Sequence, residues 1–238
     1  MHEQAAWLYD DRGARSAFYL GAVAPDARIV SGQRREETHF FDIPGAEGDP
    51  PAQEVMLARW PELRCRAAPS DRQRAALVAG YITHLVMDQT WVEMIVMPGL
   101  FIEGMTWNTN HPNWRVYSIL MTYLEYRASQ RLPREVLVEL SSAAPAAGLP
   151  FLSLEHLLGW RDHVVHHIEA GGARQVSRLF ARSSGLTTEA LEGIVSSEEQ
   201  MAREAYHLVP HRWLQAFEAE AADRSLRAVL RYLGDREV

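Results

Sequence analysis

The segment from Ser70 to Met97 constrains the fold of this chain more than any other. Ser70 and Asp71 are good N-cap residues, and Pro98 followed by Gly99 predicts where the helix ends. At about 1.5 Å per residue this helix would be roughly 40 Å long. Apolar residues occur nearly all around it, so we expect it at the centre of a helical bundle.

The rest of the chain also shows helical periodicity, and we find no segment with the clean alternation of a strand bounded by turns. Further helices are predicted near the front of the chain, shortly after Pro133, and over residues 16–23, 112–132, 153–170, about 187–209 and 211–233. Residues 44–51 predict a surface loop, and 143–150 are a second possible linker. We therefore expect an all-α fold, a single domain of about nine helices spanning residues 1–238.

Composition excludes several classes of protein. The 238 residues include 31 acidic and 24 basic ones, and a net charge of -7 does not suit binding to a nucleic-acid backbone. All the basic residues are arginine, which excludes a lysine Schiff base and a P-loop lysine. Because Cys65 is the only cysteine, an internal disulfide and a thiolate zinc cluster are excluded too. Any metal ion must therefore be held by His, Asp and Glu, and the chain has ten histidines.

The sequence also bears on membranes and targeting. It contains no run of 18 apolar residues, so we expect no transmembrane segment. Its first residues, Met-His-Glu-Gln, lack the basic and apolar regions of a signal peptide. For the chain as given we therefore expect a cytoplasmic location.

Two polar residues interrupt the apolar helix at the spacing of metal ligands. His84 and Asp88 are four residues apart, so they project from one face of the helix. A buried carboxylate without a partner is costly, and Asp88 therefore requires a metal ion or another charged group if it faces the core. The alternative is a core histidine that bonds only to its neighbour on the helix.

A second polar pair lies in the first third of the chain. Asp26 follows Pro25, which ends an apolar helix, so its carboxylate lies at a turn beside the core. His39 stands between Thr38 and Phe40, after the charged run 34–37. An aspartate at such a turn is more often a helix cap or a solvated residue.

Taken together, Asp26, His39, His84 and Asp88 resemble the zinc-dependent phospholipase C family, whose bacterial members are all-helical and hold two or three zinc ions. The resemblance covers roughly residues 15–95 and is carried by FYLGAVAPD, THF and GYITHLVMDQ in that order. It implies that Asp26 is a general base, that His39 and His84 are ligands of one zinc, and that Asp88 bridges two zincs. The implied reaction is hydrolysis of a phosphodiester or phospholipid-like small molecule by metal-activated water.

The chain also departs from the family pattern. His2 is the nearest candidate for the family's ligand on the first helix, so the metal-site segments would concentrate in residues 1–115. Glu93 and Met94 stand where the family has a further histidine, and a later His-x3-Glu pair is absent. We therefore expect one or two zinc ions, with no third site.

Other residues are candidates for weaker reasons. Trp91, Glu93 and His111 are candidate substrate contacts, although core packing explains Trp91 and a turn or helix cap explains His111 equally well. His163 and His167 have metal-ligand spacing, but their charged neighbours also suit a solvated helix face. Beside a zinc-dependent phosphodiester hydrolase, two alternatives stay open: a non-catalytic helical protein with one structural metal, and a protein that binds a partner through its helical surface.

Overall fold

The computed structural model describes residues 6–43, 48–64, 71–101 and 111–234. Across these ranges the protein is all-α, as predicted: no strand is present, and extended pairing is limited to one bridge between Leu149 and Leu152. Nowhere in the described ranges does a helix combine the length and the apolar character needed to cross a membrane. The chain divides into two compact units, which are described separately below.

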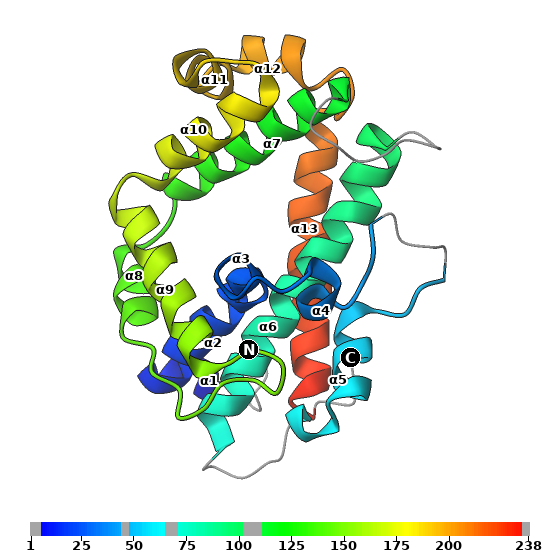
Figure 1. Cartoon of the computed structure of the whole chain (residues 1–238). Helices are drawn as coiled ribbons and strands as arrows, with labels where there is room; N and C mark the ends of the chain where they lie inside the picture. The colour runs from blue at the N-terminus through cyan, green and yellow to red at the C-terminus, as the bar shows by residue number, and fades with distance from the viewer. Residues whose placement is uncertain (1–5, 44–47, 65–70, 102–110, 235–238) are drawn as a thin grey trace. The chain divides into compact units, whose positions relative to one another are not determined.

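Unit 1 comprises Met1–Thr90, Arg134–Val165 and Ala219–Val238. Its elements in chain order (Figure 1) are α1 (Trp7–Asp10), α2 (Arg12–Val23), the 3-10 helix η2 (Ala24–Ala27), α3 (Arg28–Ser31), α4 (Arg35–His39), α5 (Ala52–Arg59), the 3-10 helix η3 (Pro61–Leu63), α6 (Arg72–Trp91), α8 (Arg134–Ser141), α9 (Leu154–Glu169) and α13 (His211–Tyr232).

Unit 2 comprises Trp91–Pro133 and His166–Glu218. Its elements are the π-helix η5 (Val92–Leu100), α7 (Pro112–Ser129), α10 (Gly172–Ser184), α11 (Thr188–Val195) and α12 (Glu198–Glu204). Helices α6, α9 and α13 each contribute residues to both units. The single domain expected over residues 1–238 therefore stays a prediction.

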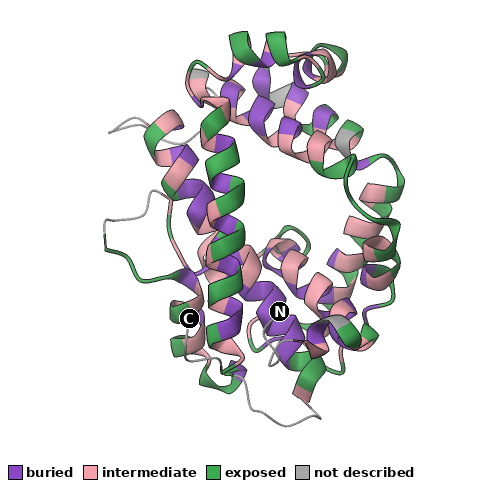
Figure 2. Cartoon of the chain, turned by 180° about the vertical axis from the view of Figure 1, so that it is seen from behind, coloured by how far each residue is buried: buried purple, intermediate pink, exposed green. Residues whose placement is uncertain are grey.

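Helix α6 lies in the core of unit 1, as its composition predicts. Every residue from Ala75 to Ile82 is buried, Tyr81 among them. Figure 2 colours the ribbon by this burial. His84 and Asp88 follow this buried stretch at positions that are only partly covered. The helix therefore passes through the core after its exposed first turn and then presents polar side chains at an accessible place.

Helices α2 and α6 approach each other closely at a pair of glycines. A Cβ atom on Gly21 would lie 1.9 Å from the carbonyl oxygen of Leu77, and one on Gly80 would lie 2.0 Å from that of Phe18. Because no side chain fits these gaps, only glycine allows the two backbones to come so near. The contact brings the end of α2, and with it Asp26, beside the part of α6 that carries His84.

The predicted helix end at Pro98 is wrong. Helix α6 gives way to η5, which continues through Pro98 as far as Leu100. In a π-helix each N–H bonds to the carbonyl five residues back, as Phe101 does with Val96 at 2.7 Å. This wider turn accommodates a proline that an α-helix would exclude by a clash with the carbonyl four residues before it.

The single helix expected over 187–209 is also wrong, because the structure has two helices there. The hydroxyl of Ser197 accepts a hydrogen bond from the N–H of Gln200 and so begins α12 as a new helix. Helices α5 and α10 have no counterpart among the predicted helices. The helices predicted after Pro133 and over 112–132, 153–170 and 211–233 are confirmed as α8, α7, α9 and α13.

Candidate metal centre

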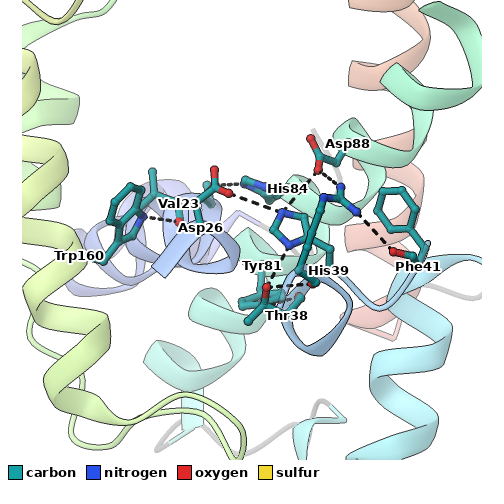
Figure 3. Close-up of polar contacts among 11 residues, drawn as sticks. Val23, Asp26, Thr38, His39, Phe41, Tyr81, His84, Asp88 and Trp160 are labelled. Atoms are coloured by element: carbon teal, nitrogen blue, oxygen red, sulfur yellow. Dashed lines mark hydrogen bonds and ion pairs between the residues drawn. The ribbon is translucent and has the colours of Figure 1, made fainter. Parts of the chain in front are cut away.

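Four predicted site residues come together in unit 1 from three separate segments of the chain (Figure 3). Asp26 lies in η2, His39 ends α4, and His84 and Asp88 lie one turn apart on α6. His39 Nε2 is 3.6 Å from Asp26 Oδ1 and 3.5 Å from Asp88 Oδ2. The centres of the His39 and His84 rings are 5.3 Å apart. The order and spacing of these residues in the sequence therefore correspond to a real cluster.

Three of the four residues form a group that could hold a metal ion. One donor atom from each of Asp26, His39 and His84 lies within 4.8 Å of the other two. Donor atoms about 2.1 Å from one zinc ion lie roughly 3.4 Å apart, so no pair of these donor atoms would have to close by more than about 1.4 Å. In the described part of the chain, His163 and His167 belong to no such group.

A hydrogen bond to the end of α2 orients His84. Its Nδ1 lies 2.9 Å from the carbonyl oxygen of Ala22, and since a carbonyl only accepts, Nδ1 carries the proton. Ala22 lies in the last turn of α2, where carbonyl groups have no partner within the helix. The neighbouring carbonyl of Val23 accepts a bond of 2.7 Å from Trp160 Nε1. This arrangement leaves Nε2 of His84 available to a metal.

A chain of two hydrogen bonds orients His39 in the same sense. The hydroxyl of Thr38 donates to the carbonyl of Arg35 at 3.2 Å, so its oxygen accepts from His39 Nδ1 at 3.0 Å. The hydroxyl of Tyr81 in turn donates to the carbonyl of Thr38 at 2.6 Å and ties the end of α4 to α6. His39 Nε2 is thus left with a lone pair that faces Asp26 and Asp88.

Phe40 turns the chain immediately after His39. Its φ of 61° lies in the left-handed region, which costs a residue other than glycine about 1–2 kcal/mol. The ring of Phe40 is buried and meets the ring of Phe151 edge to face at 5.1 Å. Packing in the core therefore holds the turn that places His39 at the end of α4.

The electrostatics of the cluster leave the imidazole of His39 in the neutral form that a metal ligand requires. Burial lowers the pKa of His39 to about 2, with the charge of Arg35 acting in the same direction, so the ring is neutral at pH 7. Burial also raises the pKa of Asp26; His84 opposes this effect and the carboxylate of Asp88 adds to it. Lone pairs on these groups face one another, and a divalent ion would compensate them.

Asp88 has a different partner. Its Oδ2 accepts a hydrogen bond of 2.5 Å from Arg35 Nη2 and is not part of the group of three. The guanidinium of Arg35 also donates to the carbonyl of Phe41 at 3.3 Å and lies 4.4 Å from the centre of the Phe41 ring. The compensating charge that the sequence requires for Asp88 is thus an arginine. The four-residue spacing of Arg35 and His39 is the signal that could have revealed it.

The other predicted site residues are placed elsewhere. His2 lies outside the described residues. Trp91, Glu93 and His111 belong to unit 2. Trp91 is buried with its ring 5.2 Å from that of Phe217, Glu93 is exposed on η5, and His111 caps α7 by accepting from the N–H of Asn113. A role for these three in binding substrate stays a prediction.

In comparisons with known proteins, no family model, no curated protein and no solved structure matches this chain. The likeness to zinc-dependent phospholipase C therefore rests on the order and spacing of the residues named above. The clustering of Asp26, His39 and His84 is a separate observation, because it comes from the positions of their atoms.

Proposed function

We propose that this protein is a zinc-dependent hydrolase of phosphodiester bonds, similar to phospholipase C. The observation that carries the proposal is the convergence of Asp26, His39 and His84, with Nδ1 of each imidazole already engaged. Metal-binding histidines generally have a hydrogen-bond partner on the nitrogen that does not touch the metal. Two neutral imidazoles and a carboxylate also form a donor set that suits Zn²⁺.

Among the described residues, the number of candidate ligands and the exposure of Asp26 favour a catalytic metal over a structural one. Structural zinc sites usually have four protein ligands, whereas catalytic sites have three and keep one position open. The side chain of Asp26 is 40% exposed, which gives water and substrate access to the group. A zinc ion bound there would activate water and stabilise the negative charge that develops on the phosphate.

Asp26 has two possible roles in this reaction. Its carboxylate belongs to the group of donor atoms, which favours a role as the third ligand. The resemblance instead implies a general base, and its raised pKa would suit it to accept a proton. We propose the ligand role, because it is the one that the positions of the three side chains support.

The surroundings of the group favour an anionic substrate with apolar parts. Arg28 and Arg35 both act electrostatically on Asp26 and His39, and Arg28 Nε is buried without a hydrogen-bond partner among the described residues. Ile29 is 59% exposed and Val30 is 42% exposed, three and four residues after Asp26. Positive charge beside exposed apolar side chains suits a phospholipid-like phosphodiester.

The test combines metal content with turnover. The protein is stripped with a chelator, reloaded with Zn²⁺ and assayed with bis(p-nitrophenyl) phosphate and p-nitrophenyl phosphorylcholine. We expect H84A to lose bound zinc and hydrolysis together, because His84 is one of only three proposed ligands. H156A is the control, since His156 bonds to Ser153 at the start of α9 and is outside the group. Full zinc content in H84A, or equal turnover by the stripped protein, would contradict the proposal.

A second variant separates the two roles of Asp26. We expect D26N to lose zinc, whereas D162N, which changes a 67% exposed carboxylate of the same unit, should keep it. Retained zinc with lost hydrolysis in D26N would make Asp26 a general base. Zinc bound by the unmodified protein without hydrolysis of either substrate would favour the structural-metal alternative.

A further inference from the structure

We infer that Arg35 takes the place of a second metal ion, so that the centre holds a single divalent ion with a guanidinium beside it that binds an anionic phosphoryl group. The inference rests on the proposed metal site of Asp26, His39 and His84. It concerns residues whose contacts are all within unit 1.

The position of Arg35 relative to the cluster is the first step. Asp88 Oδ2 lies 3.5 Å from His39 Nε2 and 2.5 Å from Arg35 Nη2, so the two nitrogen atoms are at most about 6 Å apart. In sites with two metals the ions lie about 3.5–4 Å apart, each about 2.1 Å from its ligands. The guanidinium therefore occupies the side of Asp88 Oδ2 that a second ion bound to this oxygen would need.

The guanidinium is also held firmly there. Asp88 binds Nη2, the carbonyl of Phe41 accepts from Nη1, and the Phe41 ring covers one side of the group. The side chain is 24% exposed, in contrast to that of Arg34, which is 72% exposed. A second ion at Asp88 would have to break an ion pair and displace a partly buried arginine.

The balance of charge points in the same direction. The carboxylates of Asp26 and Asp88 are matched by the guanidinium groups of Arg28 and Arg35, which act on the same cluster. One divalent ion gives this group a positive charge that suits an anionic ester. A second divalent ion at Asp88 would be repelled at short range by the guanidinium of Arg35. Only the two carboxylates would then be available to offset the charge of both ions.

Arg35 has donors left for a ligand. A guanidinium carries five N–H groups, and the contacts with Asp88 and Phe41 each use one nitrogen of the terminal pair. Arginine suits phosphate because its planar fork forms two parallel hydrogen bonds to neighbouring oxygens. A phosphoryl group at the zinc ion would therefore meet Arg35 as a second positive partner.

The experiment measures zinc per chain in the folded protein by elemental analysis after equilibration with excess Zn²⁺ and gel filtration. We expect one zinc in the unmodified protein, two in R35Q, and one in R35Q/D88N, because the double variant lacks the carboxylate that R35Q sets free. R34Q removes the same charge from the neighbouring exposed residue, which pairs with Glu36, and should keep one zinc. Inorganic phosphate should bind at least tenfold more weakly to R35Q carrying one equivalent of zinc than to R34Q.

Two zinc ions in the unmodified protein, or one in folded R35Q, would overturn the inference, as would equal phosphate affinity in R35Q and R34Q. If R35Q does not fold, D88N decides the matter: it should keep one zinc and bind phosphate. Loss of zinc in D88N would make Asp88 a ligand of the first ion and would refute the substitution by Arg35. Absence of zinc from the unmodified protein would refute the proposed function itself.

Discussion

The close contact between α2 and α6 makes Gly80→Ala a sharp test of how the site is positioned. A methyl group at residue 80 would lie 2.0 Å from the carbonyl oxygen of Phe18 and 2.8 Å from the backbone nitrogen of Ala22. Both obstacles are backbone atoms, so no side-chain rotation relieves them. The helices must separate, and they are the two elements that bring Asp26 beside His84.

The size of the effect follows from these distances. A Cβ atom essentially never approaches another heavy atom closer than 3.0 Å, so the backbones must move apart by about 1 Å. Forcing extra volume into a packed core costs typically about 1–3 kcal/mol. Alanine recovers roughly 1 kcal/mol as a better helix former than glycine. Both atoms that the new methyl group would meet belong to the backbone of α2, so the cost should lie at the upper end of this range. After the gain in helix propensity we expect a net loss of about 2 kcal/mol.

Urea unfolding and zinc titration measure the two consequences of Gly80→Ala. The free energy of unfolding should fall by about 2 kcal/mol. Zinc affinity should fall about 10–100-fold, the loss usual when groups that orient the ligands are disturbed. Gly159→Ala is the matched control on α9, because a Cβ there has no neighbour within 4 Å. It should raise stability by about 0.5–1 kcal/mol and leave zinc binding unchanged.

The two glycines thus predict opposite signs for the same chemical change. A Gly80→Ala protein as stable as the unmodified one would refute the close contact between the helices. Normal zinc affinity together with the expected loss of stability would show that the contact supports the fold without positioning the site.

Three further predictions concern single interactions in unit 1. Asp11 caps α2 by accepting hydrogen bonds from two backbone N–H groups. D11A should therefore lower the free energy of unfolding in urea by about 1 kcal/mol, and D11N by clearly less. Equal losses in the two variants would contradict the cap. The buried hydroxyl of Tyr81 donates a hydrogen bond to the carbonyl of Thr38. Y81F should therefore lower the free energy of unfolding by about 1 kcal/mol and weaken zinc binding. An unchanged stability would exclude that bond. Arg15 binds both oxygens of Glu139 and holds the pKa of that carboxyl below its usual range. The pair therefore stabilises the protein above about pH 4.5, and this stabilisation disappears as the pH falls. E139Q should therefore be less stable than the unmodified protein at pH 7, and the difference should shrink as the pH falls through the lowered pKa of Glu139; a difference independent of pH would contradict the ion pair.

The helical class and the polar pair His84 and Asp88 could be predicted from the sequence for a physical reason, whereas the grouping of Asp26 and His39 with them was implied by the resemblance to zinc-dependent phospholipase C. An apolar helix interrupted by His84 and Asp88 requires a polar or charged partner nearby. The identity of the groups around Asp88 could not be predicted in the same way. Arg35 stands in a run of four charged residues that resembles a solvated surface, and only the folded chain shows which member turns inward.

The helix ends show a similar limit. Pro98 usually ends an α-helix, but it is tolerated where the hydrogen bonds shift to a π pattern, and that shift depends on tertiary packing. Ser196 and Ser197 carry a capping signal inside a segment of continuous helical periodicity, so the new start at Ser197 is clear only in retrospect.

Phe40 places two incompatible demands on one position. Its backbone conformation would suit glycine, whereas its buried ring fills a part of the core that glycine would leave empty. No single amino acid meets both demands, so substitutions at residue 40 exchange backbone strain for a cavity and cannot remove both. Changes to the aromatic residues around it, such as Phe151, should therefore alter the direction of the His39 ring. At the proposed metal site, core mutations selected only for stability would then also change the affinity for zinc.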